Sequence, residues 1–192
     1  MTHRRSTSMI TAVLAAASLA ASSCGVGDQA APVEISGAHL PAPPSTVAGS
    51  TQRIGRQVRV YLVASSDQLV PAVRSDPVGD IGAALKDLLA GPSRAEVAAG
   101  ITSAVPSGTR LSSAQLLGTT ARLDFTEQLT SVTGHEELLA FAQIVTTACA
   151  SPGVEQVEIY VAGQAVNAPE PNGTLAQGPV TAADYTSLLP GG

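Results

Sequence analysis

Alternation of hydrophobic and polar residues indicates strands at several places in the chain. Val58, Val60 and Leu62 alternate with Arg59 and Tyr61. Branched apolar residues at every second position are typical of a strand with one buried face. Similar alternation, or a strand-like stretch beside a turn, recurs further along the chain. The predicted strands cover residues 57–63, 110–117, 121–125, 157–161 and 164–166.

A different period, with a hydrophobic residue at every third or fourth position, indicates helices. In the first helix Ile81, Leu85, Leu88 and Leu89 share one face, and Asp80 is placed to cap its start. The glycine and proline that follow are expected to end it. Between this helix and the strand before it, the polar stretch 64–79 is expected to be a connection.

The second helix is predicted from both its start and its apolar face. Thr133 and Glu136 have the spacing of a capping box. Thr181 and Asp184 repeat this pattern ahead of a short last helix that runs toward Leu189. The face of the second helix is formed by Leu138, Phe141, Ala142, Val145 and Cys149.

These elements predict an α+β fold, a two-layer sandwich with helices on one face of a single, mainly antiparallel sheet. The expected order is β-α-β-β-α-β, which is ferredoxin-like, with a small extra hairpin strand and a C-terminal helix. The stretch 93–108 is less regular and is expected to be a loop with a short helical turn. One such layer of helices on one sheet would bury every apolar face.

The N-terminal quarter of the chain has a different character. Arg4 and Arg5 precede the stretch 9–21, which is apolar or small and carries no charge. This predicts a signal peptide over residues 1–23, because the stretch is shorter than the roughly 20 residues of a spanning helix. Residues 24–52 are rich in Ala, Pro, Ser and Gly and predict a disordered tether. Residues 53–192 are then expected to form one domain.

Cys24 directly follows the small residues at the end of the predicted signal. The sequence Ala21-Ser22-Ser23-Cys24 resembles the lipobox of bacterial lipoproteins, although that pattern usually has Leu where Ala21 stands. The resemblance implies lipid on Cys24 and attachment to the outer face of the cytoplasmic membrane. The alternative is ordinary signal cleavage, which would release a soluble secreted protein.

The charge of the chain bears on its partners. The chain has ten basic residues and 15 acidic ones, and cleavage would remove two of the basic residues, Arg4 and Arg5. Eight basic residues would remain against 15 acidic ones. This balance argues against a nucleic-acid partner, because such binding depends on clustered Lys and Arg.

Catalytic and metal-binding patterns are scarce in the sequence. His135 is the single histidine of the predicted domain, and its place at a helix start beside two glutamates favours a solvated residue over a catalytic base. Cys149 ends an apolar helix face and is expected to be a small buried residue. Clustered zinc or calcium ligands and a phosphate-binding loop are absent from the sequence, so no cofactor or metal is predicted.

Arg122 and Asp124 form the one charged pair that alternates with core residues on a predicted strand. They are expected to lie on the open side of the sheet, away from the helices, and are a speculative interaction site. Two structural roles are also open: cross-strand pairing within the sheet, or bracing of the next loop by Asp124 through Thr126.

Several stretches, taken in order, resemble the GerMN domain, which is named for the sporulation and germination protein GerM and is common in lipoproteins of Gram-positive bacteria. The resemblance implies a non-enzymatic α+β domain related to ring-building folds, which pack against copies of themselves or against partners. GerM has two such domains and this chain has length for one, so ring assembly does not follow. The similar stretches are 58–63, 84–92, 103–109, 121–125, 137–145 and 152–154.

The sequence thus favours a non-catalytic lipoprotein whose GerMN-like domain meets an envelope protein, or a second copy, through the open sheet face or an edge strand. The alternative is a module that binds a small ligand or cell-wall glycan in a cleft near residues 103–109. An enzyme that uses His135 is the third and weakest hypothesis.

Overall fold

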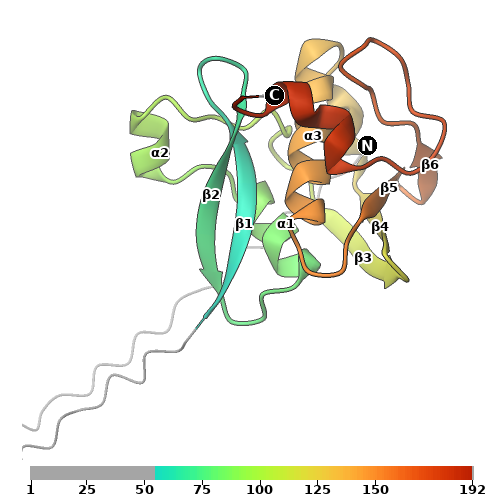
Figure 1. Cartoon of the computed structure of the whole chain (residues 1–192), viewed down its shortest axis with the longest axis horizontal. Coiled ribbons are helices and arrows are strands. Elements are labelled where there is room, and N and C mark those ends of the chain that lie inside the picture. The colour runs from blue at the N-terminus through green and yellow to red at the C-terminus, as the bar shows by residue number, and fades with distance from the viewer. Residues whose placement is uncertain (1–54, 192) are drawn as a thin grey trace, which may run out of the picture. The chain divides into compact units, whose positions relative to one another are not determined.

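The computed structural model describes residues 55–191. The predicted signal peptide, the tether and Cys24 lie outside the described residues. Figure 1 shows strands and helices in mixed order, which confirms the α+β class. The elements are β1 Arg56–Val63, β2 Leu69–Asp76, α1 Ile81–Leu89, α2 Arg94–Ala98, β3 Leu111–Leu117, β4 Thr120–Phe125, η1 Glu127–Ser131, α3 His135–Cys149, β5 Gln156–Val161, β6 Gln164–Val166 and η2 Ala182–Leu188.

The first two strands form an antiparallel hairpin, β1–β2. β1 confirms the first predicted strand, but β2 lies where the sequence predicted a polar connection, and that prediction was wrong. Pro71 interrupts the alternation within β2, so the sequence of this strand lacks the two-residue period that indicates a strand. A proline is compatible with an edge strand when its missing N–H would face away from the ladder. Pro71 lies opposite Tyr61, whose own backbone groups point away from β2.

The other four strands form a second sheet in the order β3–β4–β5–β6. β3 and β4 are antiparallel, β4 and β5 are parallel, and β5 and β6 are antiparallel. The parallel pair arises because α3 carries the chain back across the sheet between these two strands. The expected single sheet was therefore wrong. Alternation shows that a strand has one buried face, but it does not show which strand lies beside it.

Helices α1 and α3 separate the two sheets (Figure 1). α3 contacts β1, α1, β5 and η2, and it is buried from Leu139 to Ala148 without interruption. A helix buried on all sides belongs to the interior of a domain. The prediction of helices on one face of one sheet is corrected accordingly, because the helices are covered by strands on two sides.

Polar side chains of α3 close the free edge of β1. The Tyr61 N–H donates to Thr147 Oγ1 at 3.0 Å, and Gln143 Nε2 donates to the Tyr61 carbonyl at 2.9 Å. Gln143 Oε1 also accepts from Ala104 N at 2.7 Å. Gln143 and Thr147 are both fully buried. Because buried backbone groups need partners, these two side chains take the place that another strand would fill.

The helix starts agree with the sequence in part. Asp80 caps α1 as predicted, since its Oδ1 accepts from Ala83 N at 2.8 Å. The capping box predicted at Thr133 was wrong: α3 begins after Gly134, whose φ of 67° suits glycine, and no side chain caps it. At the C-terminus, Thr181 N donates to Asp184 Oδ2 at 2.7 Å as the pattern predicted, but the helix that follows is a 3-10 helix.

Short α2, within the predicted loop, is attached to the hairpin by one ion pair. Arg74 on β2 binds both carboxylate oxygens of Glu96, at 2.9 and 2.7 Å. Glu96 Oε2 also accepts from Ser93 N at the start of the helix. The Arg74 guanidinium, followed by the Ser93 N–H, lowers the pKa of Glu96 from 4.5 to about 2.

The segment after β6 is attached to the domain at two points. Val180 exchanges two backbone hydrogen bonds with Val157 on β5, and the buried Tyr185 hydroxyl donates to the Pro169 carbonyl at 2.9 Å. None of the helices between residues 55 and 191 has the length and apolar character needed to cross a bilayer.

Candidate interaction surface

The open face of the four-stranded sheet carries the polar residues of its two central strands. On β4, Ala121, Leu123 and Phe125 are fully buried, while Arg122 is exposed and Asp124 is half-buried. The structure therefore places Arg122 and Asp124 on the side of the sheet that faces away from the core. This is the side that the alternation predicted.

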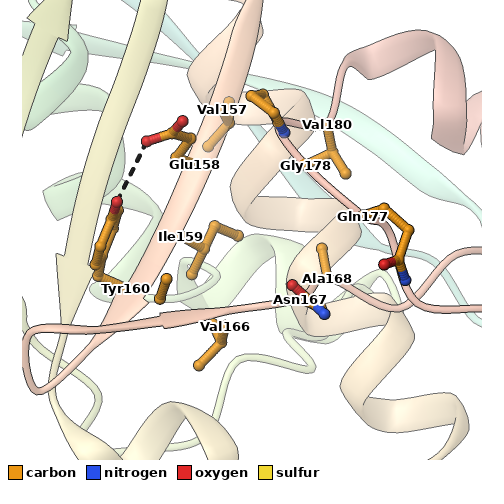
Figure 2. Close-up of a pocket in the computed structure, with 12 residues that line it drawn as sticks. Val157, Glu158, Ile159, Tyr160, Val166, Asn167, Ala168, Gln177, Gly178 and Val180 are labelled. Atoms are coloured by element: carbon orange, nitrogen blue, oxygen red, sulfur yellow. Dashed lines mark hydrogen bonds between the residues drawn. The ribbon is translucent and has the colours of Figure 1, made fainter.

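The parallel pairing of β4 and β5 brings two further polar residues beside them. Glu158 lies opposite Arg122, and Tyr160 lies opposite Asp124. Figure 2 shows Glu158 and Tyr160 on one side of β5 and Val157 and Ile159 on the other. We call Arg122, Asp124, Glu158 and Tyr160 the open-face cluster.

Arg122 and Tyr160 form a cation–π pair at the centre of this cluster. The Arg122 guanidinium carbon lies 4.0 Å from the centroid of the Tyr160 ring. Such a pair contributes about 0.5–1 kcal/mol at an exposed site. The Tyr160 hydroxyl donates to Glu158 Oε2 at 3.4 Å, as the dashed line in Figure 2 marks. Stacking and hydrogen bonding together hold a positive charge and a flat ring at the surface.

Asp124 has a structural partner in the next turn. Its Oδ1 accepts from Gly163 N at 3.1 Å, which fixes the turn between β5 and β6. Ala162 and Gly163 have φ values of 49° and 78°, as in a type I′ turn. The alternative of bracing through Thr126 is not what the structure shows, because Thr126 Oγ1 accepts from Arg110 N. Asp124 thus shapes the surface beside Arg122.

Two hollows border the open-face cluster, and Tyr160 lines both. The first has a volume of about 190 Å³ and lies over β3, β4 and the Gly163 turn. The second has about 220 Å³ and lies between β5, β6 and the segment 177–180 (Figure 2). Both are small beside the roughly 300–1,000 Å³ of typical ligand pockets.

The other residues considered in the sequence lie apart from this surface. His135 is exposed, and its Nε2 lies 3.3 Å from Asp67 Oδ2 in the loop after β1. Cys149 is partly buried, and this burial raises the pKa of its thiol. Within residues 55–191, no three His, Cys, Asp or Glu side chains are grouped so that they could hold a metal ion.

The cleft expected near residues 103–109 has a counterpart in the structure. A hollow of about 390 Å³ lies between the end of α1, α2 and the loop that follows α2. Its lining is mainly apolar and includes Leu89, Val97, Ile101 and Val105. This hollow is larger than the two beside the open-face cluster, and it is separate from that cluster.

The fold and surface define an α+β module with two sheets, a buried central helix and an open polar sheet face. The chain belongs to the Germane family, because the model of that family matches residues 57–167. The description of the family is sporulation and spore germination. This match covers more than half of the chain and confirms the resemblance to GerMN domains. The family is a GerM-type domain.

Solved structures agree on the fold. The tandem GerMN domains of the sporulation protein GerM from Bacillus subtilis give a TM-score of 0.55 at 19% identity, over 73% of this chain and 50% of that chain. The first GerMN domain of the same protein gives a TM-score of 0.54 at 15% identity, over 66% of this chain and 98% of that chain. This chain thus spans about half the length of the tandem structure. No curated protein matches the chain.

Proposed function

We propose that this chain is a non-catalytic envelope lipoprotein whose Germane domain binds another protein through the open-face cluster. The observation that carries the proposal is the Arg122–Tyr160 pair, at 4.0 Å, on a sheet face that no helix of residues 55–191 covers. Arginine and tyrosine are enriched where proteins meet, because each adds a large contact area and hydrogen bonds. A non-catalytic role fits a surface whose hollows are lined by neither His nor Cys.

The cluster is tested by capture of partners from intact envelopes. Arg122→Ala and Tyr160→Ala should each lower the amount of cross-linked partner about tenfold or more, as for a contact at the centre of an interface. Tyr160→Phe keeps the ring and should keep most of the capture. Arg59→Ala, on the exposed face of β1, is the matched control. Equal capture by Arg122→Ala and Arg59→Ala would contradict this surface.

The anchor is a separate part of the proposal and rests on sequence. Lipid on Cys24 would hold the domain at the outer face of the membrane, with residues 24–52 as the tether. Cys24→Ala should move the protein from the membrane fraction to the soluble fraction, and intact mass should show lipid only on the wild type. If the wild type carries no lipid, the protein is secreted and the anchor is disproved.

The hollow of about 390 Å³ supports a second candidate, the binding of a small ligand or cell-wall glycan. A bound ligand stabilises the folded state by mass action. Envelope glycan fragments should then raise the melting temperature of the wild type but not that of Val97→Arg, which places charge in the hollow. No shift in either protein would leave the protein-binding function as the one supported.

A further inference from the structure

β3 is an edge strand of the four-stranded sheet. It pairs with β4 on one side, and no described strand pairs with its other side. Leu117 and Thr120 close a tight hairpin, so the residues of β3 alternate between facing β4 and facing outward. By this alternation the backbone N–H and C=O groups of Ala114 and Leu116 point out from the sheet. Within residues 55–191, no hydrogen bond outside the sheet is recorded for these groups.

Both edges of the β1–β2 hairpin are protected. Gln143 and Thr147 close the β1 edge, and Pro71 lies on the β2 edge. Proline, charge and bulges are the usual devices that keep an edge from pairing with another chain. β3 has neither proline nor charge, and its one irregularity is the bulge between Leu111 and Ser113. Its regular part, 113–117, is therefore open to pairing.

This edge also exposes apolar surface. Leu116 is 44% exposed and Leu117 is 56% exposed, and both lie at the end of β3. An uncharged strand with exposed leucines and free backbone groups is a template for another strand.

We infer that β3 pairs with β3 of a second copy of this chain, antiparallel, about a two-fold axis at Gln115. The bulge restricts regular pairing to residues 113–117, and Gln115 is the centre of that range. Ala114 of one copy then lies opposite Leu116 of the other, and the two outward residues of each strand form about four backbone hydrogen bonds. Gln115 lies opposite its own copy in a pair without backbone bonds, where side chains come closest.

Charge complementarity favours a second copy over an unrelated strand. In this register Arg110 of one copy reaches the β3–β4 turn of the other. Glu155 lies at that turn, where its N–H donates to the Thr119 carbonyl at 2.9 Å. Arg110 and Glu155 are both exposed, and neither takes part in an ion pair recorded for the described residues. The two-fold axis would place these opposite charges at the same end of the strand pair, once at each end.

The pairing goes beyond the proposed function and leaves the open-face cluster uncovered. The two sheets would join edge to edge, so both copies of Arg122 would lie on the same side of one continuous sheet. A dimer would present the proposed binding surface twice to a partner.

Sedimentation velocity on the full chain with Cys24→Ala, over a concentration series, tests the inference. This chain should show a monomer–dimer equilibrium. Adding Gln115→Lys should raise the dimer dissociation constant at least about tenfold, because like charges then face each other across the axis. Gln115→Glu should do the same, and an equimolar mixture of the two variants should recover a dimer. Gln57→Lys, on exposed β1, should dimerise like the parent chain.

Three results would overturn the inference: a parent chain that stays monomeric at all concentrations, a Gln115→Lys chain that dimerises like the parent, or a mixture that recovers no dimer. Melting temperatures of all variants show whether each is folded. A monomeric chain that still captures an envelope partner would contradict the β3 dimer but not the proposed function. A dimer that captures no partner would contradict the proposed function but not the β3 dimer.

Discussion

Two polar clusters of this domain differ in burial and in what they contact. Gln143 and Thr147 are fully buried on α3 and hydrogen-bond the backbone of Tyr61. Arg122 and Tyr160 bind each other on the open face of the other sheet. The buried pair completes a strand edge, so its loss would leave backbone groups without partners. The exposed pair joins β4 to β5 through side chains alone, so its loss would leave no buried backbone group without a partner.

The largest effect on stability is expected at Gln143. Gln143→Leu keeps the side-chain volume but leaves the Tyr61 carbonyl and the Ala104 N–H without a partner. Two unsatisfied buried groups cost roughly 2–6 kcal/mol. Urea unfolding should show a loss of this size. A loss below about 0.5 kcal/mol, which is typical of a surface site, would remove the contrast between the clusters.

A smaller effect is expected at Thr147, which accepts one hydrogen bond. Thr147→Val keeps the shape of the side chain and leaves the Tyr61 N–H unsatisfied. The expected cost is about 1–3 kcal/mol. Thr147→Ser retains the hydroxyl and should lose less. If Ser and Val destabilise equally, the hydrogen bond to β1 is not what matters at this position.

Much of this architecture follows from local patterns. The apolar faces predicted α1 and α3, and alternation predicted β1, the β3–β4 hairpin and β5. Local patterns do not encode which strands pair over long range. The division of the strands into two sheets was therefore not predicted. Pro71 breaks the alternation of β2, so this strand was not predicted. α3 begins after Gly134, which has a positive φ, and not at the predicted cap Thr133.

The candidate surface was predictable to the same extent. Alternation placed Arg122 and Asp124 on the open face, and it also marks Tyr160 as an outward residue of its own strand. That Tyr160 stacks on Arg122 depends on the parallel pairing of β4 and β5. This pairing joins segments separated by the whole of α3, so no local signal reveals it.

The ion pair between Arg74 and Glu96 makes stability depend on pH. The pKa of Glu96 is lowered to about 2, so its contribution is present above pH 4.5 and is lost as pH falls toward 2. The pair is partly exposed, and its expected contribution is about 1 kcal/mol. Glu96→Gln should be less stable than wild type at pH 7, with the difference shrinking through this window.

Asp76 also has a lowered pKa, caused by the Gly79 and Val78 N–H groups, so the wild type has more than one source of acid sensitivity. The difference between wild type and Glu96→Gln isolates the Glu96 carboxylate, with its ion pair to Arg74 and its hydrogen bond from Ser93 N. A difference that stays constant from pH 7 to pH 2 would show that Glu96 contributes through helix capping or packing and not through its charge.

Stability and partner capture measured on the same variant, Arg122→Ala, test the open-face cluster most directly. The unfolding free energy should change by less than about 1 kcal/mol, because only an exposed cation–π pair is lost, and envelope partner capture should be lost. Unchanged capture, or capture lost only in proportion to a large destabilisation, would contradict the claim that the open-face cluster is a binding surface.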